Sequence, residues 1–143
     1  MGYWVGGTLG LVICAFARAV GFDRDRAFYP TVLIVVASYY VLFAVMGGST
    51  RTLVLELGLM SAFVVIAVVG FRRSLWLVAA GLAAHGVMDF FIHARIVENP
   101  GMPPWWPAFC GSFDIAVPAC LVGLSSTGRW RAESATVRGR IAG

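Results

Sequence analysis

The segment HGVMDFFIH places three side chains that can bind a metal at equal intervals, at positions 85, 89 and 93. Residues spaced by four share one face of a helix, so His85, Asp89 and His93 form a stripe within about 80° of arc. Neutral imidazole and carboxylate are ligands for zinc, iron and manganese. The stripe therefore predicts a divalent metal site, with zinc favoured and iron or manganese as alternatives.

His85 and His93 are separated by about 12 Å along such a helix, so one ion is not expected to take the whole stripe. We expect a single ion bound by Asp89 and one histidine and completed by Glu56 and Asp114, with the other histidine supporting these ligands. A site with two ions is the alternative. The carboxylate that is not a ligand, Glu56 or Asp114, is the candidate catalytic base that takes a proton from metal-bound water.

Other residues of the apolar segments have weaker indications of a role. Tyr39 and Tyr40 are candidates for giving a hydroxyl to the site or to a substrate, although such tyrosines more often only pack. The loop ENPGMPPWWP, residues 98–107, is interpreted as a stiff cover with tryptophans at the lipid headgroups, and a substrate lid is the alternative. The cysteines are interpreted as small packing residues of the apolar segments: Cys14, Cys110 and Cys120.

The elements that carry these residues are predicted to be membrane-spanning helices. Of 143 residues, 59% are hydrophobic and 13% are charged, whereas soluble domains have about 45–50% apolar and about 25% charged residues. This composition excludes a water-soluble globule and a disordered chain. Cutting the chain at its charges leaves five stretches near the length of about 20 residues that spans a bilayer. We predict an all-α integral membrane bundle of five transmembrane helices in a domain of residues 1–128, over 3–21, 29–48, 52–71, 74–94 and 107–127.

The arginines set the predicted orientation, because loops rich in basic residues stay in the cytoplasm. Of 11 basic residues, only Arg51 and Arg95 fall on the side of the N-terminus. We therefore expect the N-terminus outside and the C-terminus inside. Residues 129–143 form a basic cytoplasmic tail that is expected to be flexible. The net charge of +4 indicates attraction to anionic lipid and not to nucleic acid.

This topology brings the ionisable residues to one depth. The third and fifth spans run inward and the fourth runs outward, so Glu56, Asp89 and Asp114 each lie about 6–14 Å below the outer surface. Ionisable groups are costly in hydrocarbon and normally face the bundle interior, where they pair. Pro118, four residues after Asp114, predicts a bend in the fifth span. We expect one polar pocket in the outer half of the bundle.

Such a pocket favours a metal-dependent intramembrane hydrolase that acts on a lipid or amphiphile, in the plasma membrane of a bacterium. One alternative is a transport module whose carboxylates conduct a cation or protons, and another is a non-catalytic assembly subunit. Residues 63–69 and 75–84 are apolar, so the inner half offers no matching polar path, and this favours chemistry over passage. The expected partners are the lipid bilayer and a lipid-like substrate, with no nucleic acid; a homo-oligomer is compatible with the sequence.

Overall fold

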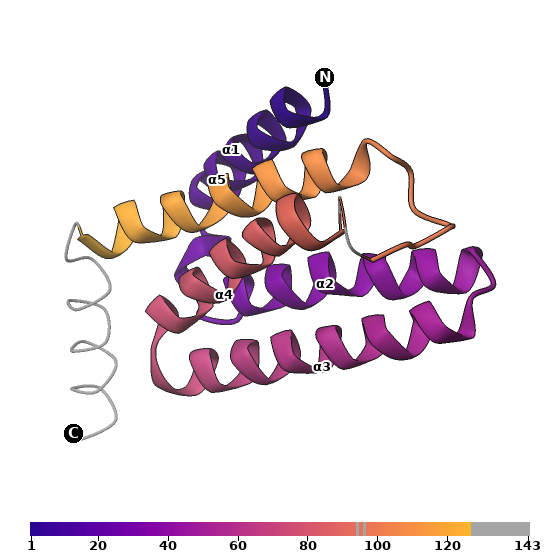
Figure 1. Cartoon of the computed structure of the whole chain (residues 1–143). Helices are drawn as coiled ribbons and strands as arrows, with labels where there is room; N and C mark the ends of the chain where they lie inside the picture. The colour runs from indigo at the N-terminus through magenta and orange to yellow at the C-terminus, as the bar shows by residue number, and fades with distance from the viewer. Residues whose placement is uncertain (94, 96, 127–143) are drawn as a thin grey trace, which may run out of the picture.

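The computed structural model describes residues 1–93, 95 and 97–126, and this part of the chain is helical apart from its turns and loops. Five helices are long and apolar enough to cross a membrane. They are α1 (Gly2–Val20), α2 (Phe28–Met46), α3 (Thr50–Arg73), α4 (Leu75–Met88) with its π-helical continuation η2 (Asp89–His93), and α5 (Trp106–Ser126); the 3₁₀-helix η1 (Phe22–Arg24) follows α1 (Figure 1).

The predicted all-α bundle of five membrane-length helices is thereby confirmed. Each helical segment begins and ends within two residues of its predicted limits. The helix α5 continues through Pro118, which has no N–H to donate to the carbonyl of Asp114. The predicted tail, residues 129–143, lies outside the described residues.

Local sequence determines where the helices begin and end. Gly21 closes α1 at a φ of 85°, in the left-handed region that glycine adopts without strain. Both α3 and α4 begin at a serine whose hydroxyl accepts a backbone N–H bond, Ser49 from Thr52 and Ser74 from Trp76, each at 3.3 Å. Because the connecting turns are short, α2, α3 and α4 are antiparallel neighbours.

The helices alternate in direction, so the bundle has two distinct ends (Figure 1). One end, called the loop end, carries the loop of residues 97–105 and the starts of α1, α3 and α5. The other, called the arginine end, carries five of the seven arginines among the described residues, namely Arg18, Arg24, Arg26, Arg72 and Arg73. That the arginine end faces the cytoplasm stays a prediction of the positive-inside rule.

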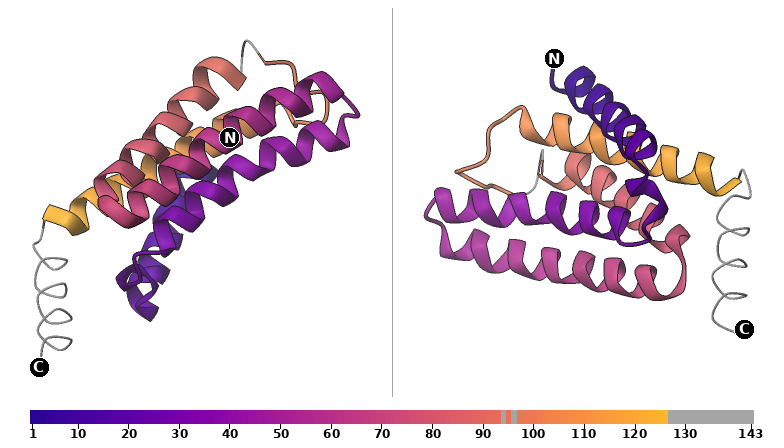
Figure 2. Two further views of the ribbon diagram at one scale, coloured as in Figure 1. Left: turned by 90° about the horizontal axis from the view of Figure 1, so that it is seen from below. Right: turned by 180° about the vertical axis from the view of Figure 1, so that it is seen from behind.

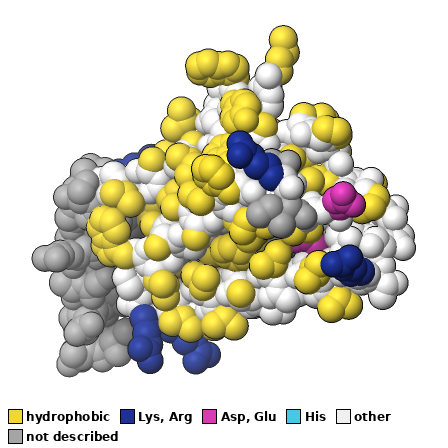
Figure 3. All heavy atoms as spheres, viewed as in Figure 1, with side chains coloured by type: hydrophobic (Ala, Val, Ile, Leu, Met, Phe, Trp, Pro, Cys, Tyr) yellow, Lys and Arg dark blue, Asp and Glu magenta, His cyan; other side chains and the backbone are white. Residues whose placement is uncertain are grey.

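Burial in this bundle is the reverse of burial in a water-soluble protein. On α3, Val54 and Val65 are 64% and 61% exposed, whereas Glu56 between them is 1% exposed. Hydrophobic side chains are spread over the whole described part of the face shown in Figure 3, and charged side chains are few there. A surface of this kind is stable against hydrocarbon and not against water, so the burial pattern supports a membrane environment.

Helix α1 packs against α5 through glycines spaced by four (Figure 2). A Cβ atom built on Gly6 would overlap the carbonyl oxygen of Phe109 and the hydroxyl of Ser112. Small residues at this spacing let two membrane helices approach closely. The glycine seam, which consists of Gly2, Gly6 and Gly10, therefore fixes the position of α5 in the bundle.

Replacing Gly6 with leucine is expected to open the glycine seam, because forcing a side chain into a packed interface costs about 1–3 kcal/mol or more. The measurement is the free energy of unfolding in mixed detergent micelles, followed by circular dichroism. Gly7→Leu is the matched control, since nothing lies within 4 Å of a Cβ at Gly7, and it should unfold like the wild type. Equal destabilisation by the two variants would contradict the role of the seam.

Candidate metal centre

Three helices bring their ionisable side chains together in the half of the bundle nearer the loop end. Glu56 comes from α3, His85 from α4, Asp89 and His93 from η2, and Asp114 from α5. All five side chains are buried, with at most 3% of each residue exposed. These residues, called the polar cluster, are the five ionisable residues that the sequence predicted to meet.

Helices α4 and α5 approach each other closely because glycine faces glycine. A Cβ at Gly86 would lie 2.9 Å from the carbonyl oxygen of Gly111 and 3.1 Å from Cβ of Asp114. The side chain next to Gly86 can therefore reach across the interface, and His85 Nδ1 lies 2.7 Å from Asp114 Oδ2. The contact between His85 and Asp114, which are 29 positions apart in the sequence, thus depends on the absence of side chains at Gly86 and Gly111.

His85, Asp89, Cys110 and Asp114 form what we call the four-residue group, in which one ligand atom from each residue lies within 4.8 Å of the others. His85 Nδ1 is 3.5 Å from Asp89 Oδ2, and the Cys110 thiol donates to Asp114 Oδ2 at 3.6 Å. Ligands placed about 2.0–2.3 Å from a tetrahedral zinc ion lie about 3.3–3.8 Å from one another. The 3.5 and 3.6 Å contacts fall in this range, whereas the 2.7 Å between His85 Nδ1 and Asp114 Oδ2 is a hydrogen-bond distance that would lengthen by about 0.6 Å around an ion. With that adjustment the group is compatible with one shared ion.

The four-residue group also has unused bonding capacity. Within the described part of the chain, three of its polar atoms have no hydrogen-bond partner, namely His85 Nε2, Asp89 Oδ2 and Asp114 Oδ1. The residues that carry them are at most 1% exposed. A buried polar atom without a partner costs about 1–3 kcal/mol, so the group is arranged to take a further ligand or proton.

Glu56 is linked to the four-residue group through His93. His93 Nε2 is 3.1 Å from Glu56 Oε2, and His93 Nδ1 is 3.2 Å from Asp89 Oδ1. A neutral imidazole has only one N–H, so two such contacts require either an imidazolium ring or a proton on one of the carboxylates. Because Asp89 contacts both histidines, the polar cluster is one continuous chain of contacts from Glu56 to Asp114.

The π-helical turn η2 places His93 on this chain. In an α-helix, four residues carry a side chain about 40° past a full turn, whereas a π-turn, with about 4.4 residues per turn, stops short of one. The side chain of Asp89 is therefore rotated about the helix axis in one sense relative to His85, and His93 is rotated in the opposite sense relative to Asp89. The predicted stripe is straighter than regular α-helical spacing would make it.

Asn99 lies at the loop end of the polar cluster and was not identified from the sequence. Its side-chain amide donates to the Tyr40 carbonyl oxygen at 3.0 Å and to Glu56 Oε1 at 3.3 Å, and the residue is only 7% exposed. The available signal was the turn formed by the Asn-Pro-Gly sequence, in which the Met102 N–H donates to the Asn99 carbonyl oxygen at 2.9 Å.

The loop of residues 97–105 lies directly over this end of the bundle. A Cβ at Gly101 would overlap the carbonyl oxygen of Phe43, so the loop backbone contacts the end of α2. On the α3 side, the Thr52 hydroxyl donates to the Glu98 carbonyl oxygen at 3.1 Å. The loop therefore covers this end of the bundle, as the sequence suggested, and its function as a lid stays a hypothesis. The expected position of Trp106 at the headgroups is wrong, because Trp106 is the first residue of α5 and its ring packs against Tyr39 and Phe43 with the indole N–H buried.

The structure separates the two neighbouring tyrosines. The Tyr40 ring is 1% exposed and stacks on the His93 ring, with centroids 3.7 Å apart and planes 13° apart. Tyr39 is 38% exposed and contacts the ring of Trp106 at 5.1 Å between centroids. Only Tyr40 therefore lies against the polar cluster, whereas Tyr39 lines a separate cavity between α1, α2 and α5.

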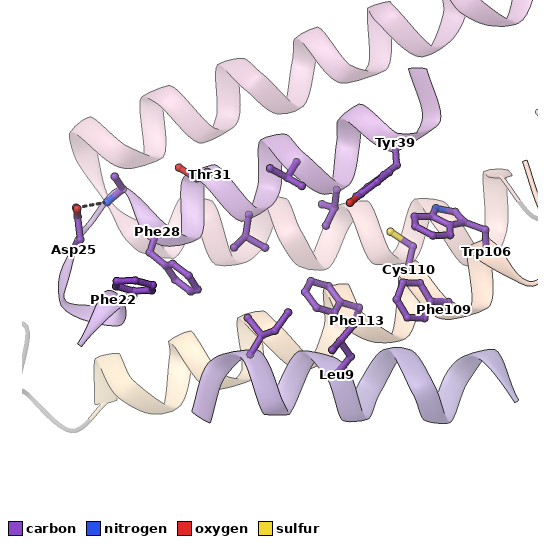
Figure 4. Close-up of a pocket in the computed structure, with 15 residues that line it drawn as sticks. Leu9, Phe22, Asp25, Phe28, Thr31, Tyr39, Trp106, Phe109, Cys110 and Phe113 are labelled. Carbon is purple, nitrogen blue, oxygen red and sulfur yellow. Dashed lines mark hydrogen bonds between the residues drawn. The ribbon is translucent and has the colours of Figure 1, made fainter. Parts of the chain in front are cut away.

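The sequence analysis interpreted Cys110 as a small packing residue. In the structure it also makes a polar contact. It lies four residues before Asp114 on α5, and its thiol contacts the Asp114 carboxylate. It also lines the apolar cavity, where Figure 4 shows its sulfur between Tyr39 and Phe113. The signal in the sequence was the four-residue spacing between a cysteine and an aspartate in one apolar segment.

Towards the arginine end, the polar cluster meets an apolar layer. The ring of Phe63 packs edge-on against His85, with centroids 4.8 Å apart. The next buried residues described along α3, α4 and α5 are hydrophobic: Ala67, Val78, Leu82, Val117 and Leu121. The chain of polar contacts therefore ends at His85 and Asp114 on this side.

Comparison of the chain with protein families, characterised proteins and solved structures found no match. The function is therefore argued from the geometry and charge of the site. Glu56, His85, Asp89, His93 and Asp114 are brought together as expected, and their individual roles stay predictions.

Asn99→Ala is expected to lower the free energy of unfolding by about 1–3 kcal/mol, because it leaves the buried Glu56 Oε1 without its Asn99 donor and removes a second donor from the Tyr40 carbonyl, which lies within α2. The measurement is again unfolding in mixed micelles. Glu98→Ala is the control, since the contact of Glu98 with Thr52 is made by its backbone carbonyl. Wild-type stability of Asn99→Ala would show that the two hydrogen bonds contribute little.

Proposed function

We propose that this protein is a metal-dependent hydrolase that works inside the membrane, binds one divalent ion, with zinc favoured, and cleaves a lipid-like amphiphile. The observation that carries the proposal is the four-residue group, whose ligand atoms lie within 4.8 Å of one another. The bundle that carries this group has five helices long and apolar enough to cross a membrane. A buried cluster of this composition in a membrane bundle marks a functional site by default.

The charge of the polar cluster supports a bound cation. With three carboxylates ionised, even two imidazolium rings leave one negative charge in the bundle interior, where an unpaired charge costs several kcal/mol. One divalent ion beside a neutral His85 and a protonated His93 makes the cluster neutral. Without an ion, neutrality requires a proton on a carboxylate, and this is the state that a proton relay would use.

His85, Asp89 and Asp114 are proposed as the three ligands. Catalytic zinc usually has three protein ligands and leaves the fourth position to water, whereas four protein ligands are typical of structural sites. Cys110 lies beside Asp114 and also lines the apolar cavity. The open position is therefore placed on the Cys110 side, from which a substrate in the cavity approaches.

The proposed reaction consumes one water molecule. An ion held by His85, Asp89 and Asp114 would make its bound water acidic enough to attack as hydroxide at neutral pH. The water oxygen bonds to the acyl carbon, the bond from that carbon to the leaving oxygen breaks, and a carboxylic acid and an alcohol are released. Glu56, which lies outside the four-residue group, would accept the water proton through the chain of contacts that joins it to the group, from Asp89 to His93 and then to Glu56, and would return it to the leaving oxygen by the same route.

Transport is the second candidate, because the continuous polar chain from Glu56 to Asp114 could relay protons. The apolar layer that begins at Phe63 argues against a path through the described part of the bundle. An assembly subunit is the third candidate, and it would be favoured by a closed metal site with four protein ligands.

Purified protein is expected to contain one zinc ion per chain, measured by inductively coupled plasma mass spectrometry. His85→Ala and Asp89→Ala should lose the ion, because each removes one of three ligands. Cys110→Ala should keep it, as should Cys120→Ala, the control cysteine on the same helix. Circular dichroism checks that each variant is folded. Folded wild-type protein that stays metal-free after addition of zinc would overturn the proposal.

The Cys110 variant separates an open site from a closed one. Loss of the ion in Cys110→Ala, with a thiolate absorption band in the cobalt-substituted wild type, would reveal a fourth protein ligand. That result would contradict the open position and favour the assembly subunit.

Glu56→Gln is expected to keep the ion but to lower hydrolysis of 4-methylumbelliferyl palmitate by about 10²–10⁴-fold, the usual contribution of a general base. The assay follows the fluorescence of released methylumbelliferone in detergent micelles. Glu98→Gln makes the same chemical change in the loop and should retain wild-type activity. Full activity of Glu56→Gln would exclude Glu56 as the proton acceptor.

A further inference from the structure

An apolar cavity of about 610 Å³ lies between α1, α2 and α5 and adjoins the polar cluster at Cys110. Figure 4 shows Phe28 at one end of this cavity, Phe113 and Leu9 along it, and Tyr39 with Trp106 at the other end. Tyr39 and Val35 are 38% and 45% exposed, so the cavity opens on the apolar outer surface of the bundle.

The size of the cavity fits one hydrocarbon chain. A methylene group fills about the volume of a water molecule in the liquid, about 30 Å³, so a chain of about 16–18 carbons fills about 500 Å³. Two such chains exceed the 610 Å³ of the cavity. Hydrocarbon is also the solvent from which such a cavity would be filled in a membrane.

The polar groups of the lining orient such a chain. At the loop end, the indole N–H of Trp106 is buried and has no hydrogen-bond partner among the described residues, and the side chain of Tyr39 lies beside it. At the arginine end, the cavity reaches Asp25, whose carboxylate accepts a hydrogen bond from Ala27 N–H at 2.9 Å. A neutral ester carbonyl is therefore best accepted at the Trp106 end, with its chain directed towards the middle of the bundle.

The Trp106 end is also where the cavity meets the four-residue group. Cys110 belongs to both, and its thiol lies 3.6 Å from Asp114 Oδ2. Trp106 and Cys110 are separated by one turn of α5, and Cys110 and Asp114 by another. A carbonyl held by Trp106 would thus lie near the open position of the proposed metal site.

We propose that this cavity binds the single long chain of a monoacyl ester, with the ester group at the Trp106 end. The identity of the ester as a substrate rests on the proposed function, whereas binding of the chain does not require hydrolysis. The cavity thus defines the substrate class as amphiphiles with one long chain.

The test measures binding of palmitoyl-lysophosphatidylcholine to the detergent-purified full chain by native mass spectrometry, with dipalmitoylphosphatidylcholine as the two-chain comparison. We expect one lysolipid per chain and at least tenfold weaker binding of the two-chain lipid. Trp106→Phe keeps the ring and removes the donor, and it should weaken lysolipid binding about 3- to 10-fold. Trp105→Phe is the matched control on the neighbouring, 55% exposed tryptophan, and should bind like the wild type.

A second variant fills the cavity. Val32→Trp places a large ring in the lining and should reduce lysolipid binding at least tenfold, whereas Val54→Trp adds the same ring on the outer face of α3 and should leave binding unchanged. The zinc content of the same samples is measured in parallel. Zinc-loaded wild type that binds no lysolipid, or binds both lipids equally, overturns the single-chain site and leaves the metal centre standing. Lysolipid bound by zinc-free protein supports the single-chain site and overturns the hydrolase.

Discussion

Compensation of buried charge is the constraint on which the packing of this bundle depends. Glu56, Asp89 and Asp114 are taken out of water among helices whose outer faces are apolar, and an unpaired charge there costs several kcal/mol. Asp89 contacts His85 and His93 at 3.5 and 3.2 Å, and each of the other carboxylates contacts one histidine. These contacts join α3, α4, η2 and α5, so a shift of any one helix would separate a buried carboxylate from its histidine.

The sequence contains more information on the depth of a residue along its membrane span than on the direction in which its side chain points from the helix axis. Depth follows from counting residues from the charged end of each span, and this placed Glu56, Asp89 and Asp114 in one layer. Rotation about the helix axis follows from a contrast between polar and apolar faces, and α4 and α5 are apolar on nearly every side. Cys110 could therefore not be distinguished from a packing cysteine, and the separate surroundings of Tyr39 and Tyr40 could not be predicted.

Two further features of the site come from the backbone and from distant contacts. The π-turn η2 has no signature in the residues Asp89–His93, although it decides where His93 points. Asn99 donates hydrogen bonds to residues 59 and 43 positions away in the sequence. The Asn-Pro-Gly sequence therefore predicts the turn at Asn99 but not these two hydrogen bonds. Close approach at Gly86 likewise depends on Gly111 of another helix. Such features become visible only when the helices are assembled.

Helix α5 contributes side chains both to the four-residue group and to the apolar cavity. Its residues Phe109 and Phe113 line the cavity, Asp114 belongs to the polar cluster, and Cys110 belongs to both. The same helix is held by close backbone approaches on two sides, to Gly6 of α1 and to Gly86 of α4. One turn of helix rises about 5.4 Å, so a group bound at Cys110 is a short distance from the Asp114 carboxylate. Because α1 and α4 both fix α5, its displacement would alter the width of the cavity and the spacing of the four-residue group together.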